Sequence, residues 1–186
     1  MKIETTAIPD VLMLTPARFG DARGWFSETF NATRMAAAGL TMDWVQDNHS
    51  MSATPGTLRG LHFQSPPHAQ DKLVRCSAGA ILDVAVDIRR GSPSYGKWVG
   101  VELTPDNARQ LLVPKGFLHG FVTLAPMTEV QYKCSDVYAP DCDGGIRWND
   151  PDIGIDWGVD DPTLSAKDTV APYLRDFQSP FEWSPS

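Results

Sequence analysis

The chain has 186 residues, of which 42% are hydrophobic and 21% are charged, as is ordinary for a soluble globular protein. This length supports one domain with a sizeable core and does not require two. We therefore expect residues 1–186 to form a single domain, with its core over about residues 3–170 and a C-terminal tail at 171–186. The net charge of -7 argues against general nucleic-acid binding, which needs an excess of Lys and Arg. It leaves room for a small anionic ligand held by a local cluster of cations.

The cysteines and the apolar runs of the sequence indicate the cellular compartment of the protein. Cys76, Cys134 and Cys142 are too few and too scattered for a disulfide framework or a zinc site. The first six residues lack the apolar core of a signal peptide, and no segment approaches the roughly 18 apolar residues of a membrane span. We therefore expect reduced thiols and a soluble, cytoplasmic protein that does not bind membranes.

The N-terminal part of the chain predicts short strands and one short helix. Residues 3–14 hold two β-prone runs, and 19–26 is a Gly-containing turn that leads into a strand. Asn31 then stands where an N-cap belongs, before residues 32–38, and Gly39 stands where a C-terminal glycine belongs. This pattern indicates a short helix.

The middle of the chain predicts a succession of strands. The clearest is at residues 82–89, where Leu82, Val84, Val86 and Ile88 alternate with less apolar residues. Further short strands are expected at 58–62, 73–76, 98–103, 110–113, 117–124 and 130–134, and the chain becomes irregular beyond Pro140. Frequent turns and scarce helix predict an all-β, antiparallel jelly-roll barrel with a few short helices.

The segment from Leu58 to Lys72 holds the first candidate for chemistry. In a strand with alternating faces, Gly60, His62 and Gln64 point the same way. An inward histidine near Arg59 and Lys72 suits proton handling beside a negative charge. It equally suits a hydrogen-bonded core histidine beside two surface cations.

A metal site is the next alternative. The segment 114–121, with His119, resembles the second motif of cupins, which are small jelly-roll barrels whose metal-binding members carry a His-x-His pair and a carboxylate in the first motif. Here His62 is followed by Gln64 instead. His62 and His119 are two donors, whereas a divalent site needs three or four. We therefore expect a cupin-like barrel without a metal.

Acid–base chemistry is the remaining alternative. Asp168 can hydrogen-bond His62, which would fix its tautomer and support the imidazolium formed when it takes a proton. Tyr132 can donate a proton from the opposite face. Each of these side chains, taken alone, also fits a structural role, and spacing does not bring them together.

A family resemblance does bring them together. In their order and residues, several motifs closely resemble the dTDP-4-dehydrorhamnose 3,5-epimerases. These motifs lie at residues 21–26, 46–50, 58–64, 72–75, 116–121, 132–134, 148–150 and 164–168. The resemblance implies inversion at C3 and C5 of a dTDP-linked 4-keto-6-deoxyglucose to give the L-rhamno 4-keto sugar. Both carbons flank the C4 ketone, so loss of a proton gives an enolate. It implies no cofactor, in line with the lack of a glycine-rich dinucleotide motif.

The resemblance also assigns residues. It implies that His62 is the base, that Asp168 orients it, that Tyr132 is the acid on the opposite face, and that Lys72 lies near the C4 oxygen. The implied ligand contacts are Arg59 and His119 on the diphosphate and sugar, Arg23, Glu28, Gln46, Asp47 and Asn48 on the nucleotide, Tyr138 stacked on the thymine, and Lys167 and Asp143. The resemblance also implies a homodimer in which some of these residues come from the neighbouring subunit.

Three positions depart from the family pattern. Asp143 stands where a longer glutamate is expected, and Trp25 and Ser27 differ from a Phe-rich run. Three alternatives stay open beside the double epimerase: an enzyme that inverts C3 or C5 alone, a non-catalytic jelly roll that binds a sugar nucleotide, and a metal-dependent cupin. The motifs do not separate the first from the double epimerase.

Overall fold

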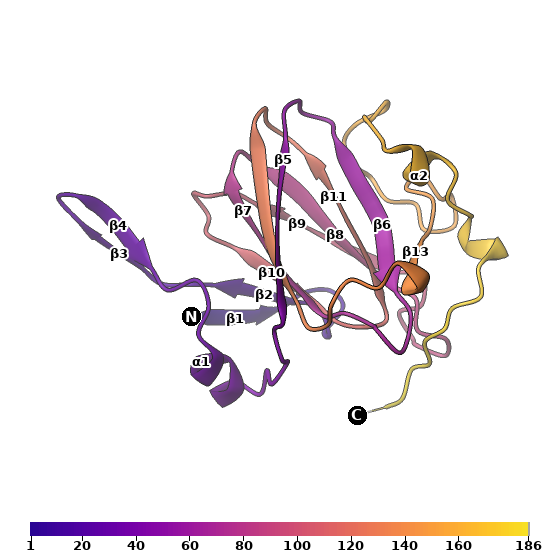
Figure 1. The fold of residues 1–186 in the computed structure, drawn as a ribbon, viewed down its shortest axis with the longest axis horizontal. Helices are drawn as coiled ribbons and strands as arrows, with labels where there is room; N and C mark the ends of the chain where they lie inside the picture. The colour runs from indigo at the N-terminus through magenta and orange to yellow at the C-terminus, as the bar shows by residue number, and fades with distance from the viewer. Residues whose placement is uncertain (186) are drawn as a thin grey trace.

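The computed structural model describes residues 1–185, which form two facing antiparallel sheets and a projecting hairpin (Figure 1). The strands are β1 (Lys2–Thr5), β2 (Leu12–Thr15), β3 (Arg18–Asp21), β4 (Gly24–Ser27), β5 (Gln46–Ser52), β6 (Leu58–Gln64), β7 (Lys72–Ala78), β8 (Ile81–Asp87), β9 (Trp98–Leu103), β10 (Gln110–Val113), β11 (Phe117–Thr123), β12 (Thr128–Cys134) and β13 (Asp143–Gly145). The helices are α1 (Ala32–Ala37), α2 (Ala166–Thr169), η1 (Pro140–Cys142) and η2 (Leu174–Asp176). Among the described residues, no helix is long and apolar enough to cross a membrane.

The strand order is that of a jelly-roll sandwich. One sheet runs β1-β2-β10-β7-β12-β5 and the other β13-β6-β11-β8-β9, so most neighbours are distant in sequence. The predicted all-β antiparallel fold is confirmed. The helix expected after Asn31 is confirmed as α1. Asn31 is its N-cap, because the Asn31 side chain accepts a hydrogen bond of 3.0 Å from the Arg34 amide.

Apolar side chains fill one end of the space between the two sheets. Val74, Leu111 and Val130 meet Ala85 and Phe121 from the facing sheet, and all five are buried. Close packing at this end sets the distance between the sheets. The other end holds polar side chains and forms the candidate site described below.

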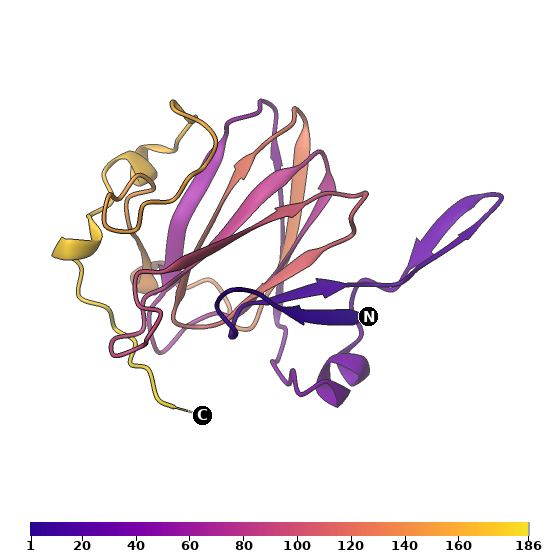
Figure 2. The ribbon, with the colours of Figure 1, turned by 180° about the vertical axis from the view of Figure 1, so that it is seen from behind.

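The chain after β13 packs on the outer face of the five-stranded sheet, beside β6 (Figure 2). Ile146 and Trp157 pack there, and the tail adds Phe177 and Phe181, whose ring centroids lie 5.4 and 6.0 Å from that of Phe63. The tail therefore packs on the barrel through these two aromatic side chains.

The hairpin of β3 and β4 extends away from the barrel (Figure 1). It forms a two-stranded sheet of its own, and its aromatic side chains Phe19, Trp25 and Phe26 are 63, 60 and 68% exposed. Such a group of apolar side chains in water marks a surface that contacts another molecule.

A β-bulge in β6 corrects the expectation that Gly60 shares a face with His62. His62 pairs with His119 and Arg59 with Phe121, so two residues of β6, Gly60 and Leu61, stand opposite the single residue Gly120 of β11. The extra residue turns Arg59 and His62 to the same side, into the space between the sheets. Gly60 has a φ of +131°, and a Cβ there would lie 2.6 Å from the Gly120 Cα.

We expect Gly60→Ala to lower the free energy of unfolding by about 1–3 kcal/mol, because the added methyl group overlaps backbone that cannot move independently. Gly24→Ala is the matched control, since Gly24 has a φ of +130° but no atom within 4 Å of its Cβ position. Urea unfolding measures both. An equal loss in the two variants would mean that backbone strain, and not the close contact of β6 with β11, requires glycine at position 60.

Candidate functional site

A cavity of about 410 Å³ opens between the two sheets. It collects Arg59 and His62 from β6, His119 from β11, Lys72 from β7 and Tyr132 from β12. These residues are far apart in the sequence, and the antiparallel pairing of their strands brings them together. All five are among those expected at the site.

His62 is paired with Asp168. Its Nε2 lies 2.6 Å from Asp168 Oδ1, and the carboxylate is almost fully buried while the imidazole faces the cavity. Burial opposes ionisation of Asp168, but the hydrogen bond and charge of His62, together with hydrogen bonds from Ser165 and the Gly60 backbone, outweigh it, so the pKa of the carboxyl is lowered. An ionised Asp168 accepts the Nε2–H, which leaves Nδ1 of neutral His62 free to take a proton.

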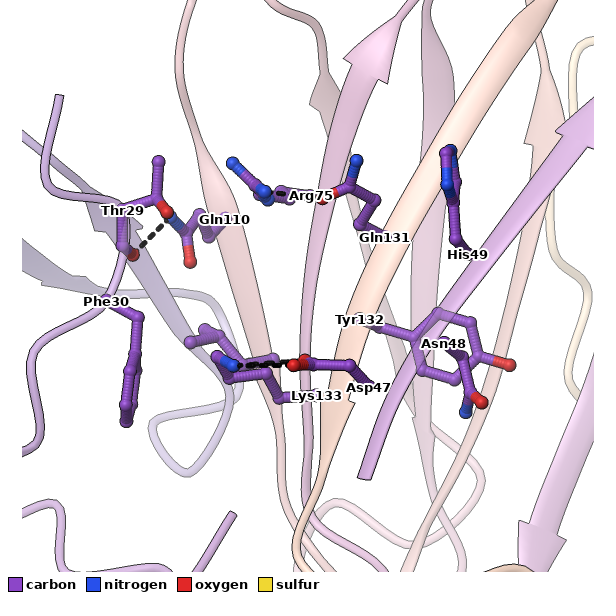
Figure 3. A pocket seen from close by; sticks show the side chains of 11 residues that line it. Thr29, Phe30, Asp47, Asn48, His49, Arg75, Gln110, Gln131, Tyr132 and Lys133 are labelled. Atoms are coloured by element: carbon purple, nitrogen blue, oxygen red, sulfur yellow. Dashed lines mark hydrogen bonds and ion pairs between the residues drawn. The ribbon is translucent and has the colours of Figure 1, made fainter. Parts of the chain in front are cut away.

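Tyr132 lies on the sheet opposite His62. Burial raises the pKa of its phenol, although the positive charge of Arg59 acts in the other direction. The hydroxyl therefore stays protonated at neutral pH and is able to donate a proton. Figure 3 shows the Asn48 side chain beside the Tyr132 ring.

Lys72 lies in the cavity between these two walls. Burial lowers the pKa of its ammonium group, and the carboxylates of Asp143 and Asp83 partly oppose that shift. A cation that has lost much of its hydration gains more from an anion placed beside it. This position suits a group that stabilises an oxyanion.

A second His–Asp pair lies beside the first. His119 Nε2 is 2.7 Å from Asp83 Oδ1, and both side chains are buried. Within residues 1–185, the other Asp83 oxygen has no hydrogen-bond partner. The sequence prediction missed Asp83, although an aspartate in the most strongly alternating apolar strand was a usable signal.

A second cavity, of about 250 Å³, adjoins the first and shares His62, Lys72 and Tyr132 with it. Five more of the expected residues line it: Gln46, Asn48, Tyr138, Asp143 and Lys167. Asp143 is ion-paired with Lys167 and accepts a hydrogen bond of 3.3 Å from the Tyr138 hydroxyl. Together the two cavities form one cleft, joined at His62, Lys72 and Tyr132.

Three expected ligand contacts lie outside this cleft. Arg23 is on the projecting hairpin, where it pairs with Asp21, and Glu28 pairs with Arg34 at 3.1 Å. Asp47 faces the other side of β5 and lies 3.0 Å from Lys133, at an outer cavity of about 520 Å³ (Figure 3). One chain alone does not bring these three residues to His62.

Gln64 has a structural role. Its amide nitrogen donates to the carbonyls of His68 (2.7 Å) and Val137 (3.1 Å), and its oxygen accepts from the Ala139 amide. It therefore holds the loop that carries Tyr138. Among residues 1–185, no three His, Cys, Asp or Glu side chains are grouped so as to hold a metal ion.

Comparison with known proteins agrees with this geometry. Residues 5–176 match the family model described as dTDP-4-dehydrorhamnose 3,5-epimerase. A protein of that name from Salmonella typhimurium is 53% identical over 94% of this chain and 96% of its own length.

Solved structures are equally similar. A dTDP-4-dehydrorhamnose 3,5-epimerase from Bacillus anthracis, with TDP and PPi bound, is 50% identical with a TM-score of 0.91, over 93% of this chain and 99% of that one. A dTDP-6-deoxy-D-glucose-3,5-epimerase from Legionella pneumophila, in complex with dTDP-4-keto-L-rhamnose, is 43% identical with a TM-score of 0.94, over 99% of both chains. The chain therefore belongs to the dTDP-4-dehydrorhamnose 3,5-epimerase family.

Proposed function

We propose that this chain inverts C3 and C5 of dTDP-4-dehydro-6-deoxy-D-glucose to give dTDP-4-dehydro-L-rhamnose, with His62 as the base and Tyr132 as the acid. One observation carries the proposal: the His62–Asp168 pair and the protonated Tyr132 lie on opposite walls of one cavity. An inversion needs a proton removed on one face of a carbon and returned on the other.

The chemistry follows from that placement. His62 removes the proton next to the ketone, and the electrons of the C–H bond move to the C4 oxygen, where Lys72 stabilises the enolate. Tyr132 then protonates the carbon from the other side as the ketone re-forms. The imidazolium and the tyrosinate return to their starting states by proton exchange with water.

The rest of the cleft is proposed to hold the nucleotide. Arg59 and His119 lie where diphosphate and sugar oxygens would extend from the reacting ring, and a guanidinium suits phosphate oxygens. The exposed Tyr138 ring lines the adjoining cavity, next to Asp143 and Lys167, and is proposed to stack on the thymine.

A homodimer is part of the proposal, because the site lacks Arg23 and Glu28. Arg23 is carried by a hairpin with exposed aromatic side chains, and such a hairpin fits the cleft of a second copy of the chain. We also propose a cytoplasmic location, which suits the three free cysteines.

Deuterium incorporation tests the function. Incubated with dTDP-4-dehydro-6-deoxy-D-glucose in D2O, the enzyme is expected to place deuterium at both C3 and C5, because the proton returned at each carbon comes from exchangeable groups. NMR and mass spectrometry locate the label. Label at one carbon alone would favour an enzyme that inverts only that carbon.

His62→Ala is the control for that experiment. We expect it to abolish exchange at both carbons while dTDP still binds with nearly the parent affinity in calorimetry, since the nucleotide contacts remain. Binding together with no exchange in the parent enzyme would favour a non-catalytic jelly roll, and unchanged turnover in His62→Ala would remove His62 from the mechanism.

Mixing two variants tests the shared site. His62→Ala and Arg23→Ala each lower activity at low substrate concentration, but in a mixed dimer one cleft keeps both native residues. If subunits exchange at random, we expect about a quarter of the parent activity to return on mixing. No recovery, in a mixture shown by mass spectrometry to contain mixed dimers, would contradict a partner-supplied Arg23.

The lowered pKa of Asp168 predicts a pH-dependent contribution to stability. The carboxylate stabilises the fold above its unfolded pKa of about 3.9, and this contribution is lost as the pH falls through the lower folded value. We expect Asp168→Asn to cost about 1–3 kcal/mol at pH 7, and the difference from the parent to shrink near pH 3.

Urea unfolding at the two pH values measures the effect of this substitution. Asp176→Asn, which changes an exposed carboxylate, should leave the free energy of unfolding nearly unchanged at both. A cost of Asp168→Asn that is the same at pH 7 and pH 3 would show that it does not come from the charge.

A further inference from the structure

Asp168 lies on a helix that is too short to be stable on its own. α2 has four residues, Ala166–Thr169, and so short a helix is unstable without outside contacts. Its N-terminal end is held in two ways. Ser165 Oγ accepts from the Asp168 amide at 3.2 Å, and the Leu58 amide donates to the Thr163 carbonyl at 2.9 Å, which ties the preceding segment to β6.

The C-terminal end of α2 is held by one side chain, that of Arg147. Its Nη2 donates to the Thr169 carbonyl at 3.0 Å and its Nε to the Ala171 carbonyl at 3.2 Å. Its Nη1 donates to the Tyr173 hydroxyl at 3.1 Å, and the guanidinium lies 4.7 Å from the centre of the Tyr173 ring. An arginine at the end of a helix satisfies carbonyls that the helix leaves open.

The backbone of Arg147 joins this end of α2 to the strand of His62. Arg147 follows β13, in which Gly145 is paired with His62, and the Ile146 amide donates to the Leu61 carbonyl at 3.1 Å. The Arg147 amide itself donates to the Pro172 carbonyl at 2.8 Å. One residue therefore connects the strand that carries the histidine with the segment that follows the aspartate.

We propose that Arg147 is a positioning residue for the His62–Asp168 pair and acts by holding the C-terminal end of α2. The inference rests on the proposed roles of His62 and Asp168. A carboxylate that orients a catalytic histidine has to stay within about 0.5 Å of its productive position, and a four-residue helix that is free at one end does not provide that.

Arg147→Met is the variant that isolates the hydrogen bonds. It keeps an unbranched apolar stem against Tyr173 and removes the three side-chain hydrogen bonds. Arg175→Met is the matched control. Arg175 also lies over the Tyr173 ring, at 5.1 Å, but within residues 1–185 it donates no hydrogen bond to the segment at 169–172.

We expect Arg147→Met to lower kcat by roughly 10- to 100-fold, as displacements of a catalytic group by about 1 Å do, with KM and dTDP affinity within about twofold of the parent. Because a looser carboxylate supports the imidazolium less, the acid limb of the kcat/KM profile should move to lower pH. Arg147→Lys, which can still reach one carbonyl, should recover part of kcat. Arg175→Met should match the parent in all of these measurements.

A double variant decides whether Arg147 acts through Asp168. In an Asp168→Asn background, Arg147→Met should change the rate of deuterium exchange by less than about twofold. The inference fails if folded Arg147→Met has the parent kcat and pH profile, or if its loss is undiminished in that background. If Arg147→Met does not fold, Arg147→Lys takes its place in both comparisons. Full activity of Asp168→Asn alone would instead remove Asp168 from the mechanism, and this inference with it, while the double inversion itself would stand.

Discussion

The site depends on the contact between two backbones, those of β6 and β11 at Gly60 and Gly120. A Cβ on Gly60 would meet the Gly120 Cα at 2.6 Å, and one on Gly120 would meet the Arg59 carbonyl oxygen at 3.0 Å. Only two glycines allow this approach, and the approach accommodates the extra residue in β6. Without it, strict alternation would turn either Arg59 or His62 away from the cavity.

The cost of a polar cavity inside a sandwich is offset by packing outside it. His62, Lys72 and Tyr132 occupy space that apolar side chains fill in an ordinary core, and each has to be paired or reach solvent. Two further apolar layers compensate: the C-terminal segment on the five-stranded sheet, and α1, through Met35, on the six-stranded sheet. The barrel is therefore stabilised from both faces as well as from its centre.

Much of the fold could be predicted from the sequence, because β8 has clear apolar alternation and β9 to β12 are short apolar runs bounded by Gly and Pro turns. The irregular features of the fold could not be predicted in this way. β13 is an Asp-Gly-Gly segment without a pattern, and the bulge at Gly60 depends on what lies across the sheet. For the cleft, the family resemblance named its residues, but a single sequence could not show that Asp47 pairs with Lys133, or that Asp83 pairs with His119. Those facts are set by the pairing of strands that are distant in the chain.

The cavity has a consequence for how two inversions are completed. The His62–Asp168 pair and Tyr132 face each other across a single space, whereas C3 and C5 lie on either side of the ketone. If His62 is the base at both carbons, as proposed, the sugar has to turn between the two steps, with its C4 oxygen remaining near Lys72. A sugar inverted once then either turns or leaves. The yield of the doubly inverted product then depends on whether the singly inverted sugar reorients faster than it dissociates. The residence time of the nucleotide in the outer part of the cleft therefore governs this yield.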